Sequence, residues 1–440
     1  MWMLALAIAA TLATGADEPG PAELVRLLGS ADRAERAEAA ISLEELGTPA
    51  LAALGEAEKS ATAEVRSRIS TITRTIEGRR LGEPTLVSLD LDGVPLEKAV
   101  QTLAERSGHR IQIEAEKDAG WTRRSVSVSA SGKIPFWEAL DRLGQAGHVR
   151  NDPSIDSWKP AKAATIRLID GDPPSWTLYR GAFRVHLASL HWQRDLDLGE
   201  FANRKPERVG VFSLSLQAFA EPGRFLDPDG TPKVEIEDDG GRTVPPPDEK
   251  TPGQPNFSSR SEIPGTIAIA QWSMKMGLPD PKAKTLRRVR GTLPVVVSAP
   301  RGEPIVVPMA EAASRTLRRG DFTLRFPTQG EAQRPGFLRG PSPRNASGSW
   351  QFDVILGRDP APSIRRDDRA WVCASHRVGF EDADGQPISW QLLQESAESG
   401  NERRLQVWIT GQRPPARLRL DDLAWSSQEI PFAFVDVPLP

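Results

Sequence analysis

The first quarter of the chain carries apolar residues at helical spacing. Four apolar positions are separated by four, three and four residues, which places them on one face of a helix: Val65, Ile69, Ile72 and Ile76. Gly47 and Gly78 stand where glycine commonly ends a helix. The pattern therefore predicts an α-helical unit over residues 17–79, with helices that end at these two glycines.

Strand-like and helix-like patterns follow each other between residues 84 and 170. Apolar and polar residues alternate in the strand-like segments, as in half-buried strands. The two helix-like segments resemble each other, and each ends in Gly-His, at Gly108 and at Gly147. An irregular insert is expected at 151–164, before a closing strand. This predicts a small α+β module over 84–170, in the order β-α-β-β-α-β, from these segments: 87–92, 96–108, 111–113, 125–129, 136–147 and 165–169.

From residue 175 onward, short apolar runs alternate with turn-forming residues. Residues 183–187 alternate apolar and polar, and similar patterns recur to the end of the sequence. The run Asp-Asp-Gly-Gly at 238–241 is typical of a tight turn between strands, and the Pro-rich stretch 244–256 is expected to form an exposed loop. We therefore expect two antiparallel β-sandwich domains, 175–310 and 311–440. The predicted fold is multidomain and mainly β overall: an N-terminal helical repeat unit, a small α+β module and two β-sandwiches.

The helical unit resembles a HEAT repeat and the start of its neighbour. The resemblance covers residues 21–78 and rests on the pattern Arg-x-x-Ala-Ala-x-x-Leu-x-x-Leu-Gly over 36–47, followed by the segments 48–51 and 63–66. A pair of short helical hairpins buries its apolar faces poorly by itself. The resemblance implies a unit that docks on the next domain or on a partner.

The run from Val87 to Ile111 reads Val-Ser-Leu-x-Leu-x-x-x-Pro-Leu-x-x-Ala-Val-x-x-Leu-Ala-x-x-Ser-Gly-x-x-Ile. This pattern resembles the short N-terminal domain shared by bacterial secretins and TonB-dependent receptors, and the resemblance covers residues 86–169. It implies an STN-like module that lies in the periplasm and acts through protein–protein contacts. The chain beyond it does not look like a secretin ring or a receptor barrel. The β-rich C-terminal half resembles only uncharacterised exported bacterial proteins.

Residues 1–16 form an apolar segment that ends in small residues just before Asp17, which is typical of a signal peptide. No lysine or arginine precedes the apolar run. An uncleaved anchor is the alternative, although a membrane span needs about 20 residues. We expect an exported protein of the periplasm or cell surface, with no transmembrane span in the mature chain.

Composition and motifs narrow the function further. A net charge of −3 argues against a nucleic-acid partner, because such proteins usually carry a basic excess. Gly-x-Ser-x-Gly, Walker, Cys-x-x-Cys and His-Glu-x-x-His motifs are absent. The single cysteine, Cys373, cannot form an internal disulfide and is expected to be a small buried residue. We therefore expect no catalytic residue, no cofactor and no metal ligand.

Twelve tryptophans against one tyrosine is an unusual ratio. Trp121 and Trp137 lie in the α+β module and are candidates for contact with a partner protein. Trp350, Trp390 and Trp425 lie in the last β region, where exposed indoles could stack on sugar rings. Most tryptophans stand in alternating apolar runs, which favours a role in a hydrophobic core.

The expected function is non-catalytic. The chain is predicted to have a structural or protein-interaction role in the cell envelope, in which the STN-like module docks other envelope proteins. Two alternatives remain open. One is binding of cell-wall carbohydrate through exposed tryptophans of the last sandwich, and the other is an unrecognised hydrolase with its active site at a sandwich edge.

Overall fold

The structure, a computed structural model, describes the larger part of residues 19–439. The predicted signal peptide lies outside the described residues, as do most of the insert at 151–164 and most of the Pro-rich loop at 244–256. The described part of the chain is mainly β with several antiparallel sheets, which confirms the predicted class. The described ranges are 19–114, 120–152, 165–197, 207–246, 257–260, 268–313, 315–328, 342–343, 349–358, 371, 373–388, 390–399, 401–410 and 413–439.

The chain divides into two compact units, Met1–Arg80 and Leu81–Pro440. The described part of the first unit is helical. Of the four predicted apolar positions, Ile69 is fully buried, Ile72 and Ile76 are nearly so, and Val65 is half-buried against the same cluster. Its helices are α1 (Pro21–Leu27), α2 (Arg33–Leu46), α3 (Leu51–Glu58) and α4 (Ala63–Gly82).

One of the two predicted helix ends is correct. Gly47 ends α2 with a left-handed φ of 65°, and its N–H donates to the Leu43 carbonyl. The prediction for Gly78 is wrong, because α4 continues to Gly82. Leu81, beyond Gly78, is buried in a hydrophobic cluster of the second unit, and this packing outweighs the modest helix penalty of one glycine.

The second unit begins with the α+β segment. β1 pairs antiparallel with β3, while β2 pairs parallel with β5 and β4 pairs antiparallel with β5. The predicted order of strands and helices is present, with β4 as one additional short strand. Its elements are β1 (Leu86–Pro95), α5 (Leu96–Ser107), β2 (Arg110–Ile113), β3 (Ser125–Pro135), α6 (Phe136–Gly147), β4 (Val149–Asn151) and β5 (Thr165–Asp170).

Two sheets follow and enclose one hydrophobic cluster. One sheet has the order β11-β12-β8-β7-β6, and in the other β13 pairs with β10 and β9 along one edge and with β23 along the other. Trp272 and Phe432 are among the large side chains buried between them. The strands are β6 (Thr177–Arg180), β7 (Phe183–Asp197), β8 (Glu207–Ala220), β9 (Phe225–Pro228), β10 (Lys233–Asp238), β11 (Phe257–Arg260), β12 (Ile269–Met276), β13 (Thr285–Pro300) and β23 (Leu423–Pro438).

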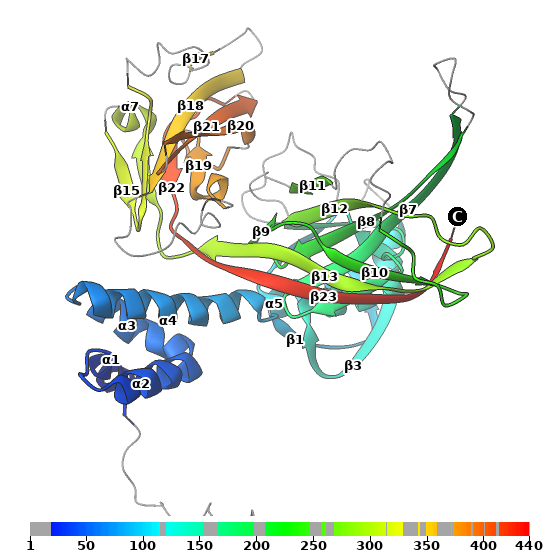
Figure 1. The fold of residues 1–440 in the computed structure, drawn as a ribbon, viewed down its shortest axis with the longest axis horizontal. Coiled ribbons are helices and arrows are strands. Elements are labelled where there is room, and N and C mark those ends of the chain that lie inside the picture. The colour runs from blue at the N-terminus through cyan, green and yellow to red at the C-terminus, as the bar shows by residue number, and fades with distance from the viewer. Residues whose placement is uncertain are drawn as a thin grey trace, which may run out of the picture. The chain divides into compact units, whose positions relative to one another are not determined.

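Residues 301–422 are inserted between β13 and β23, which lie side by side along nearly their whole length (Figure 1). The predicted boundary near residue 310 stays a prediction. β23 lies after this boundary in the sequence but pairs with β13, which lies before it. The inserted segment has its own hydrophobic cluster and two sheets, β14-β22-β19 and β15-β16-β18-β21-β20, with β17 paired to β18. Its elements are β14 (Ile305–Pro308), α7 (Met309–Ala312), β15 (Leu317–Arg319), β16 (Phe322–Arg325), β17 (Ser342–Pro343), β18 (Ser349–Arg358), β19 (Val378–Glu381), β20 (Trp390–Ser399), β21 (Glu402–Thr410) and β22 (Arg417–Leu420).

A buried cluster around Arg184 of β7 joins the α+β segment to the sheet. The Arg184 guanidinium donates to Asp141 of α6 at 2.9 Å and to the Asn151 side-chain oxygen at 2.6 Å. It also lies over the Trp137 ring at 4.4 Å and over the Phe219 ring at 4.5 Å. Because these groups come from four different elements, the cluster fixes α6 against β7 and β8.

His186 stacks on the same Phe219 ring, with ring centroids 5.1 Å apart. Burial, and secondly the nearby Arg184 guanidinium, lowers the pKa of His186 to about 3. An ordinary histidine has a pKa of about 6.5. His186 is therefore neutral in the folded chain at any pH near neutrality.

This shift predicts an acid-sensitive fold. Below about pH 6.5 the unfolded chain binds a proton at residue 186 that the folded chain does not bind. The contribution of His186 to the free energy of unfolding is therefore constant above that pH and falls by up to about 1.4 kcal/mol per pH unit as the pH drops. Urea unfolding between pH 7 and 5, above the usual carboxyl range, measures this slope.

Two histidine variants separate this effect from general acid sensitivity. His186→Gln should flatten the slope, and His148→Gln, at a side chain that is 66% exposed, is the control substitution. Equal slopes in the wild-type chain and in His186→Gln contradict the assignment.

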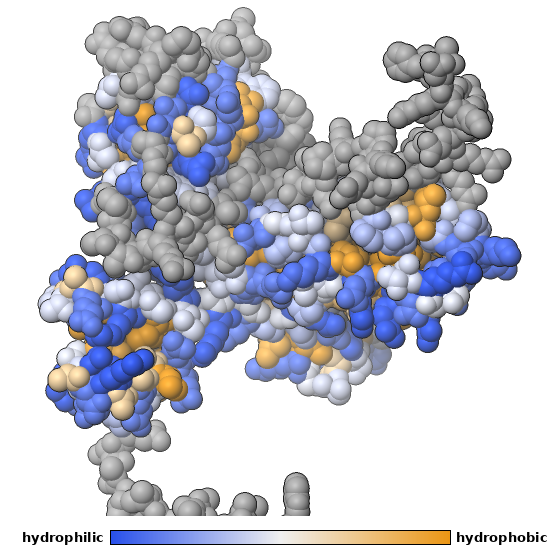
Figure 2. All heavy atoms as spheres, viewed as in Figure 1, coloured by the Kyte–Doolittle hydropathy of each residue, from blue (hydrophilic) through white to orange (hydrophobic). Residues whose placement is uncertain are grey.

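The described surface that faces the viewer in Figure 2 is mostly hydrophilic. On the face drawn in Figure 2, the apolar residues form small separate patches among polar ones. No helix of the described residues is both long and apolar enough to cross a membrane.

Candidate binding pocket

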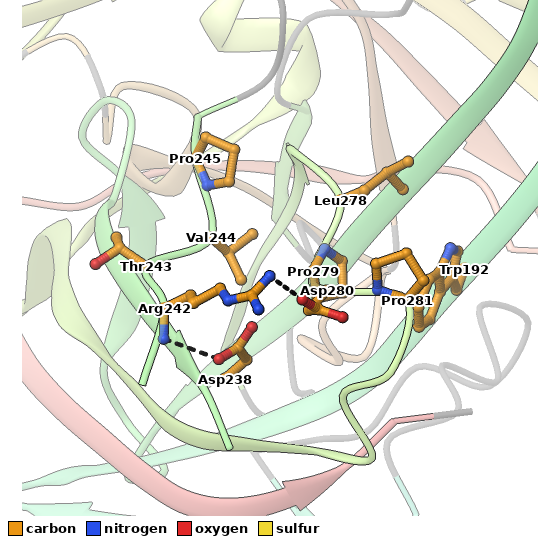
Figure 3. A pocket seen from close by; sticks show the side chains of 10 residues that line it. All are labelled: Trp192, Asp238, Arg242, Thr243, Val244, Pro245, Leu278, Pro279, Asp280 and Pro281. Atoms are coloured by element: carbon orange, nitrogen blue, oxygen red, sulfur yellow. Dashed lines mark hydrogen bonds and ion pairs between the residues drawn. The ribbon is translucent and has the colours of Figure 1, made fainter. Parts of the chain in front are cut away.

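A cavity of about 410 Å³ lies where three separate segments meet. One wall is the turn after β10, from Asp238 to Pro245, and another is the loop between β12 and β13, from Leu278 to Pro281. Figure 3 shows the side chain of Trp192, from β7, beside Pro281. Cavities of this size lie at the small end of the range that binds small ligands or single protein segments.

The first wall is a tight turn formed by hydrogen bonds. The Asp238 N–H donates to the Arg242 carbonyl, and the Arg242 N–H donates to Asp238 Oδ1, each at 2.9 Å. The Val244 N–H then donates to the Ile236 carbonyl at 2.9 Å, so the chain after the turn runs back along β10. The predicted turn at 238–241 is thus confirmed, and Asp238, which is 1% exposed, serves to hold it.

The second wall depends on a glycine. The Gly277 N–H donates to the Pro245 carbonyl at 2.8 Å. A Cβ atom at residue 277 would lie 2.5 Å from the Pro245 ring and 2.9 Å from the Pro245 carbonyl oxygen, so only glycine permits this approach. Beyond it, Asp280 Oδ1 accepts from the Lys282 N–H at 2.8 Å, which shapes the loop around Pro279.

The charged groups at the pocket already pair with each other. Arg242 Nη1 forms an ion pair with Asp280 Oδ2 across the opening (Figure 3). The other Asp280 oxygen is engaged in its own loop, and the Asp238 carboxylate is engaged in its turn. Since Arg242 is 72% exposed, the pair contributes little to stability, about 0–1 kcal/mol, and mainly orients the two side chains.

The remaining lining is largely apolar. Val244 is buried, Trp192 is half-buried, and Leu278 presents an apolar side chain that is 42% exposed. Pro245 and Pro281 complete the walls with rigid rings. An apolar pocket with a few fixed polar groups at its opening is suited to binding an apolar group, because the walls are preformed and the charges set its orientation.

The two tryptophans proposed as protein contacts differ in burial. Trp137 is fully buried and lies beneath Arg184, so it offers no surface to a partner in the folded chain. Trp121 is half-buried and packs against the hydrophobic cluster of the α+β segment. The structure brings neither of them near the pocket, whose lining comes from residues 192–281.

The three tryptophans proposed for sugar stacking all contact the hydrophobic cluster of the inserted segment, Trp425 doing so from β23. Trp390 is 3% exposed, and it meets Phe380 edge-to-face at 5.8 Å. Trp350 and Trp425 are half-buried and pack against the same cluster. A buried ring cannot stack on a sugar, so Trp390 is wrong as a stacking residue.

Sequence reasoning missed the pocket itself. Its walls are turn and loop residues with high proline content, at 242–246 and 278–281, and such runs are also typical of ordinary surface loops. Their meeting depends on the pairing of β10 with β13, which no local pattern reveals.

Metal-ligating groups and the cysteine thiol form no reactive site among the described residues. Histidine, cysteine, aspartate and glutamate side chains there form no group of three or more that could hold a metal ion. Cys373 is fully buried, and burial raises the pKa of its thiol to about 11, so the thiol stays protonated.

Comparison with known proteins assigns this chain to no family. Neither a family model nor a curated protein matches the chain. Among solved structures, a conserved domain protein from Bacillus anthracis shares 7% sequence identity over 59% of this chain and 89% of that chain, with a TM-score of 0.14. A likeness this weak supports no statement about fold or function.

Proposed function

We propose that this chain is an exported, non-catalytic binding protein of the cell envelope, and that its pocket holds an apolar segment of a partner protein. The observation that carries the proposal is the pairing of the pocket's charges within preformed apolar walls. Export is supported by the apolar segment at 1–16.

The pocket chemistry favours binding over catalysis. A general acid or base must be free to exchange a proton with a substrate. Asp280 is paired with Arg242 and with its own loop, and Asp238 is buried in a turn. Thr243 is the hydroxyl in the lining, and no histidine stands among the lining residues to activate it. An apolar side chain would therefore find a fitted site, whereas a hydrolysable substrate would find no free acid or base in this lining.

The finer arrangement of the domains is also a proposal. We infer a HEAT-like unit over 17–79, an STN-like module over 84–170, and two β-sandwiches, of which the second is inserted into the first. The observed order β1-α5-β2-β3-α6-β5 supports the STN-like assignment. One face of α6 is buried against β7 and β8 by the Arg184 cluster, so docking by the module would use its remaining surface.

A photo-crosslinking residue at position 278 is expected to capture the partner. Leu278 lies at the pocket and is 42% exposed, so a benzophenone side chain there will touch whatever occupies the cavity. The full chain carrying this residue is expressed in the cells that naturally produce it, irradiated, and analysed for a discrete heavier product by gel and mass spectrometry.

Position 393 provides the matched control. Leu393 is 46% exposed and lies in β20, outside the pocket lining. A product at 278 that is absent at 393 supports the proposal. It should disappear in the Gly277→Val background, in which the new side chain displaces Pro245, provided that the variant keeps its unfolding midpoint. Identical products from both positions, or no product from position 278, would contradict partner binding at the pocket.

A further inference from the structure

Two tryptophans differ from all the others in the described part of the chain. Of the described tryptophans, only Trp176 and Trp408 pack against none of the four hydrophobic clusters. Trp176 lies in the loop before β6, with 36% of its surface exposed. Trp408 is half-buried and lies in β21, between β18 and β20.

Strand alternation places Trp408 on the face of the sheet opposite the core. In β21 the residues Leu405, Val407 and Ile409 are fully buried in the hydrophobic cluster of the inserted segment. Gln406 and Trp408 alternate with them and therefore point to the other face. This outer face belongs to β18, β21 and β20.

Glutamine side chains surround the indole on this face. Gln351 of β18 and Gln391 of β20 stand directly opposite Trp408 on its two neighbouring strands. In the next row Gln406 stands between Asp353 and Gln394. Neighbouring strands lie about 4.8 Å apart, so each row spans about 10 Å across the sheet.

The polar groups of the face differ in their hydrogen bonding. Within the described residues, the side chains of Gln391 and Gln406 make no hydrogen bond, so their amide groups remain available. Asp353 is fully buried. In the row after it, Arg404 is held by the Ser396 hydroxyl at 3.2 Å and by Glu398 at 3.2 Å. The described residues around Trp408 therefore present neutral amides and no free cation.

We propose that the part of this face on β21 and β20 binds a neutral polysaccharide through Trp408, Gln391 and Gln406. A sugar ring has an apolar C–H face and a rim of hydroxyl groups. An indole matches the apolar face. A primary amide matches the rim, because its N–H groups donate and its oxygen accepts. Among the described residues no free cation stands beside the ring, which disfavours phosphate-rich ligands such as nucleic acids. This site is separate from the pocket, and neither depends on the other.

Affinity gel electrophoresis tests the proposal. The mature chain is run through gels that contain dextran, soluble starch, xylan or hydroxyethyl cellulose as neutral probes. Polygalacturonate serves as an acidic control. We expect retardation by at least one neutral polysaccharide. Trp408→Ala should weaken it by at least about tenfold, and Gln391→Ala and Gln406→Ala should each weaken it by several-fold through loss of one or two hydrogen bonds.

Trp176→Ala is the matched control, since it removes the other tryptophan that lies outside the cores, and it should bind like the wild-type chain. Each variant is first checked for an unchanged unfolding midpoint, and Trp408→Phe, which keeps a ring, should retain part of the binding if Trp408→Ala is unstable. The proposal fails if no neutral polysaccharide retards the wild-type chain, if only polygalacturonate does, or if Trp408→Ala binds as well as the wild type.

Discussion

Arg184→Met is expected to lower the free energy of unfolding by about 3–5 kcal/mol. The substitution keeps an apolar chain of similar length but removes the guanidinium. Asp141 is 3% exposed and would lose its ion pair, and the Asn151 side-chain oxygen would lose its donor. Tyr179 still donates to Asp141 at 3.0 Å, but a neutral donor does not replace the cation. Urea unfolding monitored by circular dichroism measures the change.

A second substitution shows whether the loss comes from the stranded carboxylate. Replacing Asp141 by leucine in the Arg184→Met background removes the buried charge and should recover most of the lost stability, because buried ion pairs are often replaceable by apolar residues. Arg184→Lys should be intermediate, since one ammonium group cannot match the planar fork of an arginine. If the double variant is as unstable as Arg184→Met alone, the ring packing of Trp137 is the dominant effect instead.

His376→Phe is expected to weaken the attachment of the inserted segment and to lower the free energy of unfolding by about 2–3 kcal/mol. His376 Nε2 lies 3.1 Å from both oxygens of Asp227 in β9, and the Asp227 side chain is fully buried. The imidazole also stacks on Phe225 at 4.3 Å with an interplanar angle of 6°. Phenylalanine preserves the stacking but cannot donate a hydrogen bond to the carboxylate. Equilibrium unfolding followed by hydrogen exchange should show residues 301–422 opening before the sheet that contains β9.

An exposed pair provides the comparison. His148 Nδ1 lies 2.8 Å from Asp172 Oδ1, but these side chains are 66% and 72% exposed. His148→Phe should change the free energy of unfolding only slightly, because water replaces the lost partner. Equal effects at the two histidines, or unfolding of both parts of His376→Phe in one step, would contradict the attachment role.

Local sequence patterns were sufficient to predict the order of strands and helices in the α+β segment. The alternation of β1 and the helical spacing of α5 and α6 depend on residues close in sequence, and the structure reproduces their order. The alternation in β7 was less informative. Phe183, Val185 and Leu187 indicate one apolar face, which suggests that Arg184 faces water. Arg184 is instead 2% exposed, because α6 covers that side of the strand.

The tryptophans show how a signal can be present and overlooked. In β21, Trp408 is out of phase with Leu405, Val407 and Ile409, so the sequence alone places it on the outer face. Trp390 lies in the same β region as Trp408 but occupies the core face of its strand. It stands opposite Ile409 and therefore points to the core. Phase along a strand is the better guide to an exposed ring.

The pairing of β13 with β23 was beyond any local pattern. A strand pattern shows that a segment can join a sheet, but its partner is set by packing over the whole unit. The pocket depends on the same long-range information, since Trp192, Arg242 and Asp280 come from three segments that only the assembled sheets bring together.

The insertion of residues 301–422 also imposes an order on folding. As the chain emerges from a ribosome or a translocation pore, β13 is followed by the entire inserted segment before β23 arrives to pair with it. Until then β13 lacks its neighbour along one edge, and unpaired strand edges are prone to join other chains. The inserted segment has its own hydrophobic cluster and can collapse before β23 pairs with β13. Closure of the sheet by β23 is therefore the late step, and a chain interrupted inside 301–422 is left with an open edge available for aggregation.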